Sequence, residues 1–227
     1  MDERSVVDVG DVRLAYRSWG ASFGSPVVLL HDVGASSASW EAAGGLLGQE
    51  WRVYGIDLRG HGESDWPDAY DLELMRDDVL GFLDECELDR VGVVGHGMGG
   101  VVAHLLAQDH PDRVERLVLV ETPPPFPGTA YPAASPDGPA DYDEAVLASV
   151  GAELADPDPA RARGLGEIVA PTLLLAGGPG SEMPQGRLQD MASLIPDCHL
   201  VTMGGGHRPH ETDPEQTAHR ITEFFTS

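Results

Sequence analysis

Residues Gly95–Gly100 read Gly-His-Gly-Met-Gly-Gly and lie between an apolar run, residues 91–94, and a helical pattern, residues 98–109. A strand, a sharp turn and a helix in this order surround the motif G-x-S-x-G, in which a strained turn presents a nucleophilic serine at the end of a sheet. The central position here is Gly97, which has no side chain. We therefore expect the turn, but covalent catalysis by a serine at position 97 is excluded.

The same six residues satisfy G-x-G-x-x-G, a fingerprint of dinucleotide binding in a strand-to-helix turn. Glu121 follows Gly100 after another apolar run, residues 117–120, roughly where that motif places its ribose-binding acid. However, the fingerprint usually lies on the first βαβ unit, whereas several strands are expected before Gly95. We therefore interpret these residues as a turn of the G-x-S-x-G type rather than as a dinucleotide-binding turn, and we expect no cofactor.

Other residues of this chain can move protons. His207 follows three glycines after the last expected strand, residues 199–203, and their backbone freedom would let the imidazole point into a cleft. Two acids follow expected strands elsewhere in the chain: Glu121 directly follows a strand, and Glu182 lies several residues into a loop. A third carboxylate, Asp32, follows the apolar run 27–30.

Composition limits the classes of function. The 227 residues carry a net charge of −24, which disfavours nucleic acids and anionic membranes as partners. All 14 basic residues are arginines, which excludes a lysine Schiff base. Cys86 and Cys198 lack the spacing of a metal site, so we expect no bound metal. With neither a membrane-length apolar stretch nor a signal-like N-terminus, we expect a cytoplasmic protein that acts on a small molecule; its oligomeric state stays open.

Alternating patterns predict an α/β fold. A hairpin over residues 6–16 precedes short apolar strands, and helical patterns lie between the strands. This order indicates a mostly parallel, doubly wound sheet of about eight strands. The expected strands after the hairpin are residues 27–30, 52–56, 91–94, 117–120, 172–176 and 199–203, and the expected helices are residues 37–47, 72–87, 98–109, 184–194 and 213–226.

One segment interrupts this alternation. Residues 122–141 contain seven prolines, a composition that cannot sustain a helix or a central strand, and an amphipathic stretch from Tyr142 to Leu154 follows. The segment is either a long surface loop or a lid over a cleft, and its position after a strand end favours the lid. We therefore expect one core, residues 1–121 and 167–227, with a short Pro-rich lid insertion at residues 122–166.

Several motifs together resemble the α/β-hydrolase family, in the order that the family has them. The resemblance covers about residues 4–226 and implies an α/β-hydrolase fold with a reduced lid, in which the serine of the nucleophile elbow is replaced by glycine. The matching segments are the oxyanion-loop residues 29–37, the Asp-Leu-Arg-Gly-His-Gly-Glu-Ser loop at residues 57–64, the elbow at residues 94–100, the penultimate strand at residues 170–178 and the histidine loop at residues 204–210.

The resemblance also implies roles for individual residues. The backbone N–H groups of Val33 and Met98 would form the oxyanion hole, with Gly97 and His96 beside them as binding residues. His207 would be the general base, and the acid that orients it would be Glu121 or Glu182. We favour Glu121 because it directly abuts the end of its strand. In the second motif, Asp57 and Arg59 are interpreted as mainly structural. His210 has a weaker claim to a role and is expected to pack near the lid.

Asp32 departs from the family pattern, which usually reads His-Gly where this chain reads His31-Asp32. A carboxylate pointing into the oxyanion hole would oppose a developing negative charge. A protonated Asp32 would instead donate a hydrogen bond there, and an outward Asp32 would cap the helix that starts near Ser37. The three possibilities stay open at this point.

Three functions are compatible with these residues. The favoured one is an enzyme without a serine nucleophile, in which His207, Glu121 and Asp32 perform acid–base chemistry of a lyase, isomerase, cyclase or decarboxylase type. Its substrate would be a small, partly apolar, carbonyl-containing metabolite. The alternatives are a non-catalytic protein that binds a ligand or another protein, and an ester or thioester hydrolase inactivated by a Ser-to-Gly change at Gly97.

Overall fold

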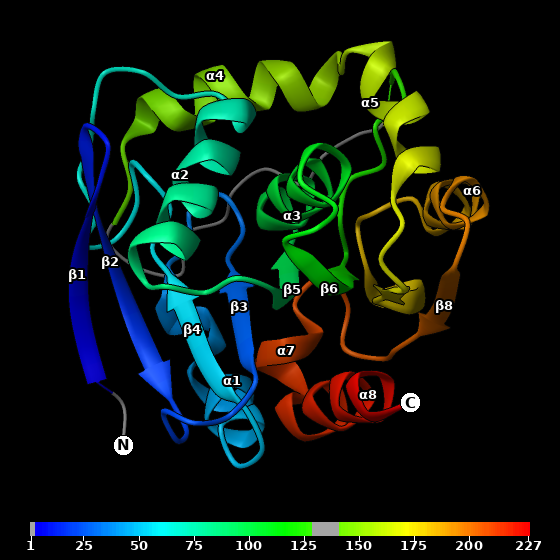
Figure 1. The fold of residues 1–227 in the computed structure, drawn as a ribbon. Helices are drawn as coiled ribbons and strands as arrows, with labels where there is room; N and C mark the ends of the chain where they lie inside the picture. Colours follow the sequence, from blue (N-terminus) through cyan, green and yellow to red (C-terminus); the bar gives the residue numbers. More distant parts are fainter. Residues whose placement is uncertain (1–2, 129–140) are drawn as a thin grey trace.

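The computed structural model describes residues 3–128 and 141–227, which contain one eight-stranded sheet (Figure 1). Its strand order is β1-β2-β4-β3-β5-β6-β7-β8; β2 pairs antiparallel with β1 and β4, and the other pairs are parallel. The predicted fold class is therefore confirmed. The strands are β1 (Glu3–Val9), β2 (Val12–Trp19), β3 (Pro26–Leu30), β4 (Arg52–Ile56), β5 (Val91–His96), β6 (Val114–Val120), β7 (Thr172–Ala176) and β8 (Cys198–Thr202).

Helices cover both faces of the sheet, α2 and α3 on one face and α1 and α8 on the other (Figure 1). Aspartates cap the starts of four helices, α2, α4, α5 and α8; for example, Asp71 accepts a hydrogen bond from Leu74 N at the start of α2, and Asp213 accepts one from Gln216 N at the start of α8. The helices are α1 (Glu41–Leu47), α2 (Leu72–Glu85), α3 (Met98–Asp109), α4 (Glu144–Ala155), α5 (Pro159–Gly164), α6 (Gln185–Leu194), α7 (Pro209–Thr212) and α8 (Pro214–Thr226), with short 3-10 turns at Ser37–Trp40, Leu165–Glu167 and Gly178–Gly180.

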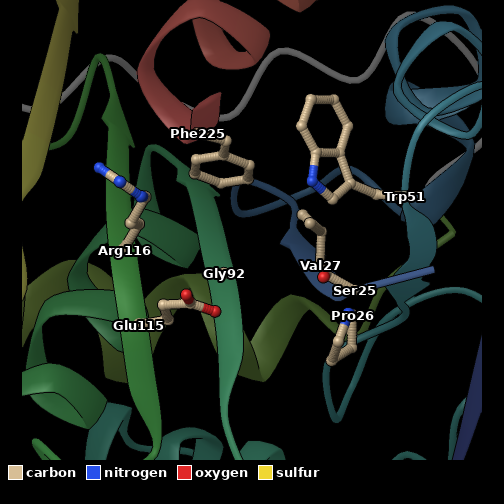
Figure 2. A pocket seen from close by; sticks show the side chains of 8 residues that line it. All are labelled: Ser25, Pro26, Val27, Trp51, Gly92, Glu115, Arg116 and Phe225. Carbon is tan, nitrogen blue, oxygen red and sulfur yellow. The ribbon is translucent and has the colours of Figure 1, made fainter. Parts of the chain in front are cut away.

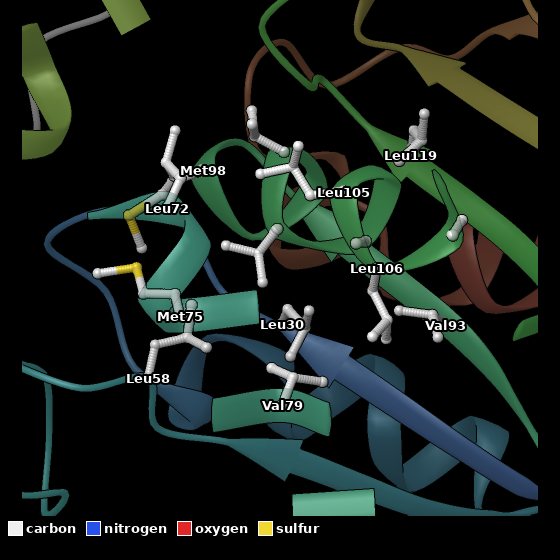
Figure 3. Packing of buried hydrophobic residues seen from close by; sticks show 14 of the residues in the cluster. Leu30, Leu58, Leu72, Met75, Val79, Val93, Met98, Leu105, Leu106 and Leu119 are labelled. Atoms are coloured by element: carbon white, nitrogen blue, oxygen red, sulfur yellow. The ribbon is translucent and has the colours of Figure 1, made fainter. Parts of the chain in front are cut away.

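The central parallel strands are apolar because both of their faces are buried. Residues 27–30 of β3 and residues 91–96 of β5 are all buried. Figure 3 shows one of the two resulting cores, in which Leu30 and Val93 from the strands pack against Leu105 and Leu106 from α3. This packing fixes the carboxyl ends of β3, β5 and β6 beside one another.

The loop after β4 is held by a buried ion pair. The Arg59 guanidinium donates two hydrogen bonds, each 2.5 Å long, to the Asp78 carboxylate on α2, and both residues are 4% exposed. Asp57 accepts hydrogen bonds from the backbone N–H groups of Ser37 and Glu63. Asp57 and Arg59 therefore hold the backbone beside the carboxyl ends of the strands, in keeping with the structural role expected of these two residues.

The predicted amphipathic stretch after the proline-rich segment forms α4. Arg161 of α5 joins this region to the core through hydrogen bonds to Glu153 on α4 (2.6 Å) and Glu73 on α2 (2.8 Å). Three of the seven prolines, at positions 132, 136 and 139, lie outside the described residues, so a closing lid stays a prediction. In the described part of the chain, no helix combines the length and apolar character needed to cross a membrane.

A hollow of about 70 Å³ lies between Trp51 and Phe225 (Figure 2). Its lining includes Val27 and Gly92, which are near the amino ends of β3 and β5. In open α/β sheets, ligands bind outside the carboxyl ends of the strands. This hollow therefore lies at the opposite edge of the sheet from the candidate site.

Candidate functional site

The turn between β5 and α3 has the strained backbone that the sequence predicts. Gly97 adopts φ 53° and ψ −121°, a conformation that favours glycine. Its N–H donates to the carbonyl of Val120 on the neighbouring strand, over 3.0 Å. The turn is therefore kept, although its central residue has no side chain.

The carboxylate of Asp32 occupies the space above this turn. Its Oδ1 accepts hydrogen bonds from Val33 N and Met98 N, each 2.8 Å long, and these are the two N–H groups expected to form the oxyanion hole. A Cβ atom placed on Gly97 would lie 2.1 Å from the same oxygen. Asp32 therefore points inward and fills the place that a side chain at position 97 would need. Helix capping, the outward alternative, is performed by Ser36 instead.

His207 lies between two carboxylates. Its Nε2 is 3.0 Å from Oδ2 of Asp32, and its Nδ1 is 3.4 Å from Oε2 of Glu121. These three residues come from the loop after β3, the end of β6 and the loop after β8. The structure thus brings together the three side chains predicted to carry the chemistry.

Glu121, rather than Glu182, is the acid beside the histidine. Glu121 is fully buried and has a φ of 45°, rare for a non-glycine residue, whereas Glu182 is exposed. Its Oε1 accepts hydrogen bonds from Gly177 N (2.5 Å) and Gln185 Nε2 (3.2 Å), and its Oε2 accepts one from the Ser181 hydroxyl. Burial alone would raise the pKa of Glu121, but the hydrogen bonds from His207, Ser181 and Gly177 lower it.

The two carboxylates determine the charge of His207. Burial alone would lower its pKa, but the hydrogen bonds and negative charges of Asp32 and Glu121 raise that pKa to about 9. The ring is therefore an imidazolium at neutral pH, and it donates through both nitrogens. In this array, the protonated His207 is an acid, and it must lose its proton before it can act as a base.

Two further histidines lie behind this array. His96, predicted to bind substrate, is instead 1% exposed, and its Nε2 bonds to the backbone carbonyl of His207 over 2.8 Å. His210, expected near the lid, packs on the Trp40 ring with centroids 4.1 Å apart. Burial lowers the pKa of His96 to about 4 and lowers the pKa of His210 well below its usual value, so both rings are neutral.

The same cluster is the place where a metal ion would find ligands. Potential ligand atoms of Asp32, His96 and His207 lie within 4.8 Å of one another. However, the hydrogen bonds described above already engage the oxygens of Asp32 and the Nε2 atoms of His96 and His207. The expectation of no bound metal therefore stays a prediction.

Comparison with known proteins identifies the family. A family model described as "alpha/beta hydrolase fold" matches residues 25–156, more than half of the chain. The chain belongs to the alpha/beta hydrolase fold family. A hydrolase structure from Pseudomonas aeruginosa PA01 is 26% identical with a TM-score of 0.85, over 99% of both chains.

Curated relatives of this family member match over shorter regions. An uncharacterized protein from Mycobacterium tuberculosis is 37% identical over 109 residues, which are 48% of this chain and 31% of that protein. A soluble epoxide hydrolase from a Corynebacterium species is 36% identical over 117 residues, which are 51% of this chain and 40% of that protein. The alignments thus span less than half the length of these two curated relatives, the second of which is named as an enzyme.

Sequence reasoning missed Ser181 and Gln185, which hold Glu121 in place. Both follow β7, 60 and 64 residues beyond Glu121, so no local pattern connects them to it. Ser181, which contacts Glu121, is the direct neighbour of the alternative acid Glu182 in the sequence. The supporting contacts become visible only once β6 and β7 are paired.

Introducing a working serine nucleophile at position 97 should require removal of Asp32. In Gly97→Ser alone, the new Cβ meets the Asp32 carboxylate, which also occupies both N–H donors. In the double variant Asp32→Gly/Gly97→Ser, the space and the donors are free. We expect the double variant to react with a fluorophosphonate probe roughly a hundredfold faster than Gly97→Ser. Equal labelling of the two would contradict the placement of Asp32.

The charge of His207 can be followed by NMR titration. We expect a midpoint near pH 9, lowered in Glu121→Gln and unchanged in the control Glu182→Gln. Because the folded pKa is above the unfolded value of 6.5, this group stabilises the fold fully below about pH 6.5 and loses that contribution as the pH rises through 9. The loss in unfolding free energy should be roughly 3 kcal/mol at most. A midpoint that falls in Glu182→Gln but not in Glu121→Gln would reverse the assignment.

Proposed function

We propose that this chain is an enzyme without an elbow serine, in which Asp32 is the nucleophile, His207 carries the proton and Glu121 orients His207. The observation that carries the proposal is the placement of the Asp32 carboxylate. One oxygen accepts from both N–H groups of the oxyanion hole, and the other faces His207 Nε2 at 3.0 Å. Asp32 thus supplies from the neighbouring loop the reactive side chain that Gly97 lacks.

The occupied donor pair favours one class of electrophile. A carbonyl substrate would need Val33 N and Met98 N for its own oxygen, but Asp32 Oδ1 already accepts from both. Attack by Oδ2 on a saturated carbon needs no such site for the substrate. The charged His207 favours a leaving oxygen, because an imidazolium can protonate an alkoxide as it departs. A strained cyclic ether, such as an epoxide, meets both conditions.

In the first step, Oδ2 of Asp32 forms a bond to one ring carbon of the epoxide. The C–O bond of that carbon breaks, and its electron pair goes to the departing oxygen. That oxygen takes the proton from His207 Nε2. The products are an alkyl ester on Asp32, a neighbouring hydroxyl group and a neutral His207. With the charge of Asp32 gone, the pKa of His207 falls, because that charge was one of its two supports.

In the second step, neutral His207 accepts a proton from water, whose oxygen attacks the Asp32 carboxyl carbon. The negative charge develops on Oδ1, which already accepts from Val33 N and Met98 N. Collapse breaks the bond between the carboxyl carbon and Oδ2, and the diol leaves with Oδ2 after protonation by His207. The new carboxylic acid returns its proton to His207. The oxygen of water therefore stays in Asp32.

The relatives support a hydrolase. The Corynebacterium relative is named a soluble epoxide hydrolase, and a relative from Burkholderia, 33% identical over 130 residues, is named a fluoroacetate dehalogenase. Both names describe reactions at saturated carbon. For this chain, a small, partly apolar epoxide is accordingly the proposed substrate.

The sequence also favoured direct acid–base chemistry on a carbonyl compound by the same three residues. That chemistry stays the second candidate, since the raised pKa of His207 suits a proton donor. It forms no bond to Asp32. A non-catalytic binding protein, which would turn over no substrate, is the third outcome of the same test.

The test is a single turnover of a panel of small aryl and alkyl epoxides in oxygen-18 water, followed by mass analysis of the peptide that contains Asp32. We expect one oxygen-18 atom in Asp32 and an unlabelled diol from the first turnover. Asp32→Asn should lower the turnover rate at least a hundredfold, with Glu182→Gln as the matched control that keeps it. Diol formation with oxygen-18 in the product and none in Asp32 would contradict the nucleophile and favour direct acid–base chemistry.

A further inference from the structure

The loop that carries His207 needs an anchor. Gly205 and Gly206 precede it with φ values of 94° and 73°, and three consecutive glycines give the backbone wide freedom. Gly206 N donates to the carbonyl of Gly177 over 3.2 Å, and the Thr212 hydroxyl donates to the carbonyl of Gly205 over 3.2 Å. These bonds hold the loop up to the residue before His207.

His96 contacts His207 itself. His96 is the last residue of β5, directly before Gly97, and β5 lies in the middle of the sheet between β3 and β6. Its Nε2 is 2.8 Å from the backbone oxygen of His207. Because a carbonyl oxygen only accepts, that nitrogen must carry the hydrogen. The neutral Nε2–H form is the form that this buried environment favours.

We infer that His96 is a positioning residue: its ring N–H holds the carbonyl of His207 and thereby keeps the His207 ring between Asp32 and Glu121. The inference rests on the proposed function, in which His207 carries the proton. It gives His96 a role that differs from substrate binding, since its ring is 1% exposed and lies 4.8 Å from the His207 ring, centroid to centroid.

The geometry of the array shows why a small movement would matter. The bond from His207 Nδ1 to Glu121 is already 3.4 Å long, close to the limit of a hydrogen bond, and the bond from Nε2 to Asp32 is 3.0 Å long. Loss of the tie to His96 would let the glycine loop carry the ring away from both acids. The titratable side chains around the His207 ring come from four elements. They are Asp32 after β3, His96 at the end of β5, Glu121 at the end of β6 and His210 on α7, and the charged Arg208 follows His207 in the chain.

The test replaces the ring N–H of His96. We expect the NMR titration midpoint of His207 to fall by about one pH unit or more in His96→Leu, and to stay nearer the wild-type value in His96→Gln, whose amide can donate. His104→Leu is the control, because His104 is also fully buried but lies on α3 and bonds to Gln108. This control should leave the midpoint unchanged. An unchanged His207 midpoint in a folded His96→Leu protein would overturn the inference.

A measurement on the unaltered protein covers the case in which His96→Leu does not fold. We expect the Nε2–H proton of His96 to exchange slowly with water and to show a scalar coupling to the carbonyl carbon of His207. An Nδ1–H form of His96, or rapid exchange of this proton, would overturn the inference. Neither NMR experiment on His96 requires a substrate. A negative result for His96 therefore leaves the oxygen-18 test of Asp32 unaffected, and a negative oxygen-18 result leaves the role of His96 unaffected.

Discussion

The carboxylate of Asp32 and the missing side chain of Gly97 are two parts of one steric constraint. Only one group can occupy the space above the elbow, because a Cβ at position 97 would lie 2.1 Å from Asp32 Oδ1. The elbow has the strained backbone of this turn, and Met98 N of the elbow and Val33 N of the loop after β3 both bind the Asp32 carboxylate. The rest of the array depends on this arrangement, since Asp32 and Glu121 together keep His207 charged.

The array is a chain of charges arranged across three strand ends. Asp32 and Glu121 contribute two negative charges around one imidazolium, and backbone N–H groups bind the outer oxygen of each acid. Buried charges persist when they are paired and hydrogen-bonded, and each of these three groups is. The fold supplies the pairing: β3, β5 and β6 are neighbours in the sheet, so Asp32, the elbow and Glu121 meet at one edge, and the loop after β8 brings His207 to them.

Much of this arrangement follows from local sequence patterns. The apolar strands and amphipathic helices have clear periodicity, and the elbow is contiguous in the chain, so fold and turn were predictable. The position of Glu121 at a strand end favours it over Glu182, and Glu121 is the acid that contacts His207. The orientation of Asp32 was not predictable, because it depends on the absence of a side chain at Gly97, far along the chain. The role of His96 was also hidden, since its partner is a backbone carbonyl in a distant loop.

Amide hydrogen exchange at Val33 and Met98 tests the central claim, that Asp32 binds both donors, most directly. We expect slow exchange at both amides in the unaltered protein and much faster exchange at both in Asp32→Gly. The amide of Gly99, which donates to the carbonyl of His31, serves as the internal control and should stay protected in both proteins. Rapid exchange at Val33 and Met98 in the unaltered protein, with Gly99 protected, would mean that the donor pair is open and would contradict the account.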